Sequence, residues 1–214
     1  MITDYAWRGG REAMLQLGPV GGPTILLIGP LFEEANRMRR LLVETMRGLA
    51  SHGVASVLPN LPGMSDSPVA TVDTRFVDWC DAVAAVVATL PPPVMTVAVR
   101  GGALLDAAGH ARWRLAPTSG ASVLRDMVRA TALSAGRKTA ELAATARAVP
   151  TRLAGNVLHP LLYAALSEAE IVGDAQLAAL AGTPWRRAEP GDDDAFVAAM
   201  VADIVDWSKT CVAR

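Results

Sequence analysis

One turn in the chain has the spacing of a catalytic turn but carries an arginine where a reactive side chain would stand. Residues 93–105 read PVMTVAVRGGALL, an apolar run over 94–99 followed by Arg100, two glycines and a helix-like segment. Ala98 and Gly102 are small, as are the residues flanking the serine of a nucleophile elbow, where a strand and a helix approach closely. We call this turn the elbow.

Arginine at this position changes what the turn can do. Its guanidinium group stays protonated and offers only hydrogen-bond donors, so Arg100 is not a nucleophile. It can bind a carboxylate or a phosphate through paired hydrogen bonds, so it is a candidate binding residue for an anionic ligand or an oxyanion. The alternative is a structural ion pair with Glu33 or Glu34, because an arginine in a partly dry crevice needs a counter-charge.

Other polar candidates follow the predicted strands. In open α/β sheets, ligands bind outside the carboxyl ends of the strands, here the apolar runs 24–28, 54–59, 94–99 and 112–117. The loops leaving these runs would place around one crevice Phe32, Glu33, Glu34, Asn36, Ser65, Ser67, Arg100 and Ser119. We take as catalytic candidates Glu33, Arg100 and Ser119. We take as ligand-binding candidates Leu31, Phe32, Glu34, Asn36, Arg39, Ser67 and Gly101, with backbone amides near Leu31 and Gly101 available to an oxyanion.

The segment FEEANRMRR at 32–40 supports two interpretations. On a helix, Asn36, Arg39 and Arg40 lie within one turn, where N-terminal amides and arginines can hold an anion. In the second interpretation, the arginines simply lie on the solvent-exposed face of an amphipathic helix. Acidic residues such as Glu33 are likewise common in the first turn of a helix.

A complete catalytic triad is not recognisable. Ser67 and Ser119 become nucleophiles only beside a base, and serines in loops rich in glycine and proline commonly form turns or helix caps. The last histidine is His159, and no histidine follows late in the chain. The histidines also lack the ligand spacing of a metal site, so we expect neither a metal nor a cofactor.

Composition favours a single globular domain. The chain has 214 residues, 51% hydrophobic and 19% charged, with a net charge of -1. These values, without a polybasic block, argue against a nucleic-acid partner.

No apolar run reaches the roughly 20 residues that span a bilayer, and no secretory signal is visible. Cys80 and Cys211 are isolated, as in cytoplasmic proteins with free thiols, so we expect a cytoplasmic location.

Strands and helices alternate through the first half of the chain. Apolar spacing predicts strands at 13–17, 24–30, 54–59 and 94–99, a helix ending near His52, and a helix from Phe76 capped by Thr71 or Asp73. This order predicts an α/β fold with a mostly parallel, doubly wound sheet. The second half predicts a strand at 112–117, helical residues 120–148 broken at Gly136, an extended piece and helix within 153–171, and a last helix at 194–209 favoured by Asp192–Asp194. We expect one domain, 1–214, with 120–170 forming a small helical cap.

Several stretches carry a family resemblance, which covers most of the chain. They are GPLFEEANRMRR, LPNLPGMSDS, VRGGALL, PTSGASVLRDMVRA, LAGNVLHPLLYAAL and WRRAEPGDDDAFVAAMVADIVDW. With them the chain resembles the α/β-hydrolase superfamily, and more narrowly the second type of exosortase-A-system-associated hydrolase of bacterial exopolysaccharide loci. The resemblance implies an α/β-hydrolase-like fold, a cytoplasmic setting, a link to exopolysaccharide production and an arginine at the elbow as a family trait.

Three functional hypotheses remain open. The first is a hydrolase or acyl transferase acting on an acyl ester or thioester, in which Arg100 grips the substrate and Glu33 or Ser119 moves protons or attacks. The second is a non-catalytic protein that binds a small anionic or acyl-bearing ligand, or that docks a partner hydrolase or a second copy of itself. The third is a purely structural ion pair at Arg100.

Overall fold

A seven-stranded sheet forms the centre of the molecule in a computed structural model that describes residues 1–21, 24–186 and 193–212. Its strands, in spatial order, are β1 (Ile2–Trp7), β2 (Gly10–Leu17), β4 (Ala55–Pro59), β3 (Thr24–Ile28), β5 (Met95–Val99), β6 (Ala111–Leu115) and β9 (Gln176–Leu177). The β1–β2 and β2–β4 pairings are antiparallel, and all the others are parallel.

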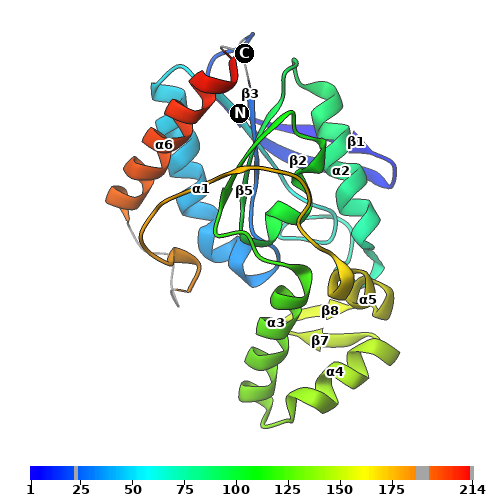
Figure 1. The fold of residues 1–214 in the computed structure, drawn as a ribbon. Coiled ribbons are helices and arrows are strands. Elements are labelled where there is room, and N and C mark those ends of the chain that lie inside the picture. The colour runs from blue at the N-terminus through cyan, green and yellow to red at the C-terminus, as the bar shows by residue number, and fades with distance from the viewer. Residues whose placement is uncertain (22–23, 187–192, 213–214) are drawn as a thin grey trace.

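Long helices cover both faces of this sheet (Figure 1). Helices α1 (Glu33–Ser51) and α6 (Asp194–Val212) lie on one face, and α2 (Phe76–Thr89) lies on the other. Every residue of β3 and of β5 is buried, as expected for central parallel strands covered on both sides. The predicted α/β fold with a mostly parallel, doubly wound sheet is therefore confirmed.

Each face of the sheet has its own apolar core, anchored by a tryptophan. Trp79 of α2 is fully buried and donates its indole N–H to the Pro62 carbonyl oxygen at 2.8 Å. Trp113 of β6 is also fully buried, and it donates to Oδ2 of Asp203 on α6 at 2.9 Å. Both indoles thus bury a large apolar surface while their one polar atom keeps a partner.

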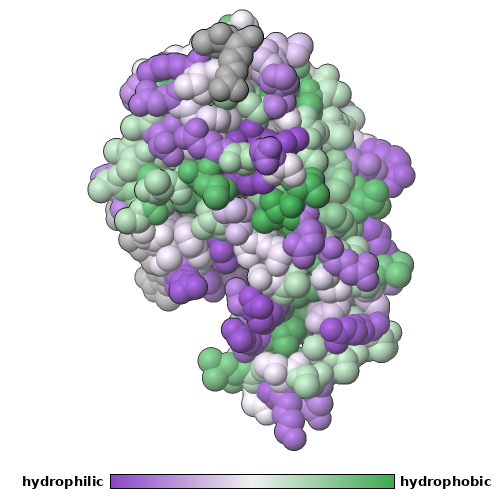
Figure 2. Space-filling model, in the orientation of Figure 1, coloured by the Kyte–Doolittle hydropathy of each residue, from purple (hydrophilic) through white to green (hydrophobic). Residues whose placement is uncertain are grey.

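A smaller unit projects beyond the carboxyl ends of the strands, and we call it the cap (Figures 1 and 2). It consists of α3 (Gly120–Ala135), α4 (Thr139–Ala148), β7 (Thr151–Leu153), β8 (Asn156–Leu158) and α5 (Pro160–Glu168). The break predicted at Gly136 is confirmed, because this residue ends α3 with a φ of 61°, a conformation that glycine adopts without strain. These elements lie between Gly120 and Glu168.

Two local predictions need correction. The helix-like segment after the elbow forms two short 3₁₀ turns, Arg100–Leu104 and Asp106–Ala108, because the buried Asp106 turns to meet Arg114. Helix α2 is capped by neither Thr71 nor Asp73, which lie in a separate 3₁₀ turn. Asp78 instead accepts a hydrogen bond from the backbone N–H of Arg75 at 2.7 Å.

The first strand and the last helix add two further comparisons with the sequence predictions. Strand β1, for which the sequence analysis predicts no element, pairs with β2 along its whole length. At α6, Asp193 accepts a hydrogen bond from the Phe196 N–H at 3.1 Å, in agreement with the predicted acidic start, while Asp192 lies outside the described residues.

None of the described helices has the length and apolar character that a membrane-spanning helix needs.

Candidate functional site

The sharp turn predicted at the elbow is present. Arg100 follows β5 directly and has a φ of 55°, a left-handed conformation that costs a non-glycine residue about 1–2 kcal/mol. Gly102 approaches β3 so closely that a Cβ atom there would collide with the carbonyl oxygens of Ile28 and Gly29. The small residue two positions after the arginine is therefore required by the packing of the turn against the neighbouring strand.

The Arg100 side chain is held by the first turn of α1. Its Nε lies 3.2 Å from Oε2 of Glu34, and its Nη2 donates to Oε1 of the same carboxylate at 3.2 Å. Nη1 donates to the carbonyl oxygen of Ala116 at 3.2 Å, and the guanidinium carbon lies 5.0 Å from the centre of the Trp185 ring. Arg100 thus forms the ion pair of the structural alternative, with Glu34 as its partner.

A cleft of about 470 Å³ opens beside this ion pair, and we call it the elbow cleft. Its apolar wall is formed by Leu31, Phe32, Val123, Met127, Ala130, Ala154 and Trp185. Among the described residues, its charged lining residues are Glu33, Glu34, Asp126, Arg37, Arg100 and Arg186, so the described acidic and basic side chains are equal in number. A cleft of this size, with apolar and charged lining residues, suits a small organic ligand that has both an apolar part and a charged group.

Strained backbone gathers around the elbow. Besides Arg100, Phe32 after β3 has a φ of 56° and Ala116 after β6 has a φ of 44°. Each lies just beyond the carboxyl end of a strand, and conformations of this kind cluster at functional sites because the surrounding structure must hold them. Leu31 lies directly against the elbow, since a Cβ on Gly101 would be 3.2 Å from its side chain.

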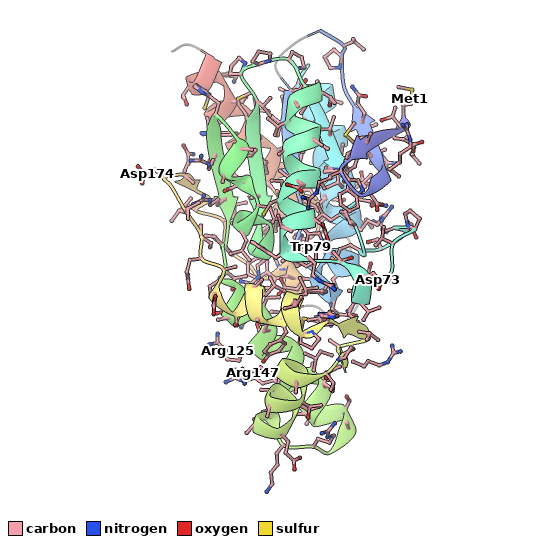
Figure 3. All side chains as sticks on the ribbon, turned by 90° about the vertical axis from the view of Figure 1, so that its right-hand side faces the viewer. Met1, Asp73, Trp79, Arg125, Arg147 and Asp174 are labelled. Carbon is pink, nitrogen blue, oxygen red and sulfur yellow. The ribbon has the colours of Figure 1, made fainter. Side chains whose placement is uncertain are left out.

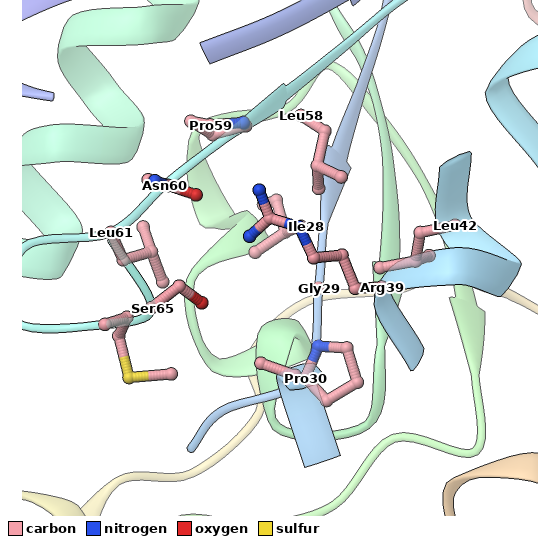
Figure 4. A pocket seen from close by; sticks show the side chains of 12 residues that line it. Ile28, Gly29, Pro30, Arg39, Leu42, Leu58, Pro59, Asn60, Leu61 and Ser65 are labelled. Atoms are coloured by element: carbon pink, nitrogen blue, oxygen red, sulfur yellow. The ribbon is translucent and has the colours of Figure 1, made fainter. Parts of the chain in front are cut away.

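The single crevice expected from the sequence is in fact divided. Phe32, Glu33, Glu34 and Arg100 line the elbow cleft, whereas Ser65 and Arg39 line a separate pocket of about 60 Å³ between α1 and the loop after β4. Figure 4 shows the Arg39 side chain reaching across this small pocket. Asn36 is exposed on α1 and lines neither cavity. Helix α1 thus directs Glu33 and Glu34 to one cavity and Arg39 to the other, although these residues lie close together in sequence.

Ser67 lies away from both cavities, in contact with a buried carboxylic acid. Its Oγ donates to Oε1 of Glu12 at 2.7 Å, and Glu12 is only 2% exposed. The other Glu12 carboxyl oxygen is buried without a hydrogen-bond partner. Burial therefore raises the pKa of Glu12, although the hydrogen bond from Ser67 lowers it in part. These contacts give Ser67 a structural role in holding the loop after β4.

Ser119 and His159 both cap helices. The Ser119 Oγ accepts from the Ser122 N–H at the start of α3, as in the cap alternative for loop serines. Nδ1 of His159 accepts from the Leu161 N–H at the start of α5, at 3.1 Å. Among the described residues, Ser51 and His52 form the one serine–histidine hydrogen bond, at the far end of α1. That end is about 28 Å along the helix from Glu33.

Several residues that complete the elbow cleft were not predicted from the sequence, and three of them come from distant elements. Asp126 and Met127 enter it from α3, and Trp185 enters it from a 3₁₀ turn (Pro184–Arg186) that follows the cap. Their positions depend on how the cap folds back over the sheet. The available signal was the TPWRR segment at 183–187, in which a tryptophan adjoins arginine, but no spacing rule connects it to Arg100.

A second arginine behind the elbow has a structural role. Arg114 of β6 forms a two-point ion pair with Asp106, at 2.7 and 2.8 Å, and the two side chains are 5% and 0% exposed. Arg114 also donates to the carbonyl oxygens of Val172 and Gly173. This network joins the 3₁₀ turns after the elbow to the chain that returns from the cap, so it supports the base of the site.

Comparisons with known proteins describe part of the fold. No protein-family model matches the chain, and no curated protein is significantly similar to it. Among solved structures, the epoxide hydrolase VrEH1 from Vigna radiata superposes with a TM-score of 0.45 and 19% identity, over 54% of this chain and 39% of that protein. Est1E from Butyrivibrio proteoclasticus, solved with ferulic acid bound, gives 0.48 and 18%, over 60% and 56%. Epoxide hydrolase I of Solanum tuberosum gives 0.45 and 25%, over 54% and 39%.

The chain spans between 39% and 56% of the length of these three proteins. The likenesses are too partial to carry an activity or a substrate to this chain.

Proposed function

We propose that this protein is a non-catalytic binder of an acyl-bearing anionic ligand, which it holds in the elbow cleft. The observation that carries the proposal is the position of Arg100, at the tip of the elbow and on the wall of a cleft where it faces apolar side chains such as Leu31, Phe32 and Met127. The described part of the cleft lining contains no serine, cysteine or histidine, so it offers no pairing of a nucleophile with a histidine base.

Arg100 retains hydrogen-bonding capacity for a ligand. A guanidinium group has five N–H donors, and the contacts with Glu34 and Ala116 use Nε and one N–H on each terminal nitrogen. One N–H on Nη1 and one on Nη2 therefore remain for a carbonyl or carboxylate oxygen of a ligand. Since Glu34 contacts only Nε and Nη2, a ligand oxygen can bind the remaining N–H groups without displacing this carboxylate.

The rest of the cleft favours an apolar chain. Leu31, Phe32 and Met127 are buried residues that present part of their surface to the cleft. An acyl chain laid along them would leave water at about 25 cal/mol for each Å² of apolar surface removed. The sequence resemblance further suggests that this binding serves exopolysaccharide production in the cytoplasm.

The test is calorimetric titration with decanoic acid at neutral pH, with Arg100→Gln as the variant and Arg47→Gln as its matched control. Arg47 lies at the other end of α1 in an exposed pair with Glu44, so its loss should leave the affinity unchanged. We expect Arg100→Gln to weaken binding about tenfold, the effect of one charged hydrogen bond of roughly 1.5 kcal/mol. Absence of binding to the wild-type protein, or equal affinity in both variants, would contradict the proposal.

The competing hydrolase hypothesis has its own measurement. If the elbow supports acyl transfer, the wild-type protein should release p-nitrophenol from p-nitrophenyl decanoate, and a fluorophosphonate should label one serine. We expect neither result. Labelling of Ser119 in particular would revive the enzyme hypothesis.

A further inference from the structure

The elbow cleft continues into a second cavity under the cap. That cavity has a volume of about 600 Å³, and it shares with the elbow cleft four lining residues, Glu33, Arg37, Ala130 and Ala154. The two spaces are therefore adjoining parts of one groove, which runs from Arg100 outward along α3. We call the second part the outer groove.

The charges of the outer groove differ from those of the elbow cleft. Its charged lining residues, in the part of the chain that the structure describes, are Arg37, Arg137, Arg152 and Glu33. Glu33 lies 3.9 Å from Arg37, which leaves Arg137 and Arg152 as the uncompensated charges. Among the described residues, no acidic side chain forms an ion pair with either arginine, and Arg152 donates only to the Gly155 carbonyl oxygen, at 2.8 Å.

This local charge agrees with that of the cap as a whole. Residues 120–168 hold six arginines and lysines against three acidic residues, whereas the remainder of the chain holds 14 against 18. An anionic group entering the groove therefore meets a positive potential at its outer end and a balanced set of charges at its inner end.

We propose that the ligand is an extended molecule with anionic groups at both ends. One end meets Arg100, the apolar middle lies along the shared wall at Ala130 and Ala154, and the far carboxylate or phosphate meets Arg137 and Arg152. This inference rests on the proposed binding at the elbow cleft and adds the length of the ligand and the charge of its distal end.

Titration with a series of α,ω-dicarboxylic acids tests the proposal, each compared with the monocarboxylic acid of equal length, from about 10 to 16 carbons. At one length we expect the diacid to bind the wild-type protein about fivefold more tightly than the monoacid. This is the effect of one partly exposed ion pair. The double variant Arg137→Gln/Arg152→Gln should lose this advantage and still bind the monoacid with wild-type affinity.

The matched control is Arg125→Gln/Arg129→Gln. These arginines line a separate groove of the cap together with Arg147, and Figure 3 shows Arg125 beside Arg147 there. The control removes the same number of positive charges from the cap but should keep the diacid preference. An equal loss in both double variants would show a general effect of the cap charge and would overturn the proposal.

The outcomes separate this inference from the proposed function. If the monoacids bind but no diacid binds more tightly, the distal site is wrong and binding at the elbow cleft stands. If neither class binds, the proposed function itself is wrong.

Discussion

Glu34 and Arg100 are 66 positions apart in the chain and meet as a two-point ion pair at the elbow, with Nε of the arginine 3.2 Å from Oε2 of the carboxylate. Their side chains are 23% and 15% exposed, so the pair is neither fully dry nor freely solvated. The negative charge that an arginine at the elbow requires is thus supplied first by the protein. A ligand joins this pair through the N–H groups that remain.

The substitution Glu34→Gln should have opposite effects on stability and on binding. Loss of the carboxylate leaves Arg100 without its counter-charge, which should lower the free energy of unfolding by about 1–2 kcal/mol, below the 3–5 kcal/mol of fully buried pairs because of the partial exposure. The same change should tighten decanoate binding, since the guanidinium group then lacks an internal anion. Urea denaturation and calorimetric titration measure the two effects.

Glu44→Gln serves as the control for that experiment. Glu44 pairs with Arg47 on the exposed side of α1, at 2.6 Å, and should change stability by less than about 1 kcal/mol. If Glu34→Gln weakened anion binding, the Glu34 carboxylate would itself contribute to ligand binding, and the proposed role of Arg100 would be wrong.

Placing a serine at the elbow should not create an esterase. In Arg100→Ser the hydroxyl would stand at the tip of the turn, but His159 is engaged as the cap of α5, and the described lining of the elbow cleft contains no histidine. We expect p-nitrophenyl acetate hydrolysis at the wild-type level, because a serine without a base is a weak nucleophile. Burst release of p-nitrophenol, with acylation at position 100, would disprove this.

The substitution Gly102→Ala should destabilise the protein much more than Gly101→Ala. A Cβ at position 102 would collide with backbone oxygens of Ile28 and Gly29, and the backbone of β3 cannot move away without disturbing the sheet. At position 101 the nearest atoms are side-chain carbons of Leu31 and Val123 at 3.2 Å, which can shift. We expect losses of about 2–3 and under about 1 kcal/mol, respectively, by chemical denaturation. Equal losses of stability in the two variants would show that contact with the Ile28 and Gly29 carbonyl oxygens does not limit the size of residue 102.

Glu12 should make stability depend on pH. Its pKa in the folded protein is raised above the ordinary value of 4.5 by burial, so the folded state favours the protonated acid. The stability linked to this preference is fully present below the unfolded pKa and is lost as the pH rises through the folded pKa. Glu12→Gln should remove this dependence.

The measurement for Glu12 is the melting temperature of both proteins from pH 4 to pH 8. The variant's melting temperature minus that of the wild type should increase with pH. Tyr5, which packs beside Glu12 and has a pKa raised by burial, stays protonated throughout and should not contribute. A difference that is constant across this range would exclude Glu12 as the source.

Much of the fold could be predicted from the sequence because its signals are local. The apolar runs that form β3 and β5, the alternation with helices α1 and α2, and the break at Gly136 each depend on a few neighbouring residues. The elbow also has a local cause, since Ala98 and Gly102 leave room for the turn. Strand β1 was missed because its sequence lacks a continuous apolar run and it is defined mainly by its pairing with β2.

The site itself was decided by the tertiary structure. Sequence reasoning offered Glu33 and Glu34 equally as partners of Arg100, and only the orientation of α1 selects Glu34. The same helix divides the expected crevice, while the returning chain brings Trp185 to Arg100 from 85 positions away. Ion pairs and clefts join segments that are distant in sequence, so they depend on how the layers pack, whereas strands, turns and helix ends depend on the conformational preferences of adjacent residues.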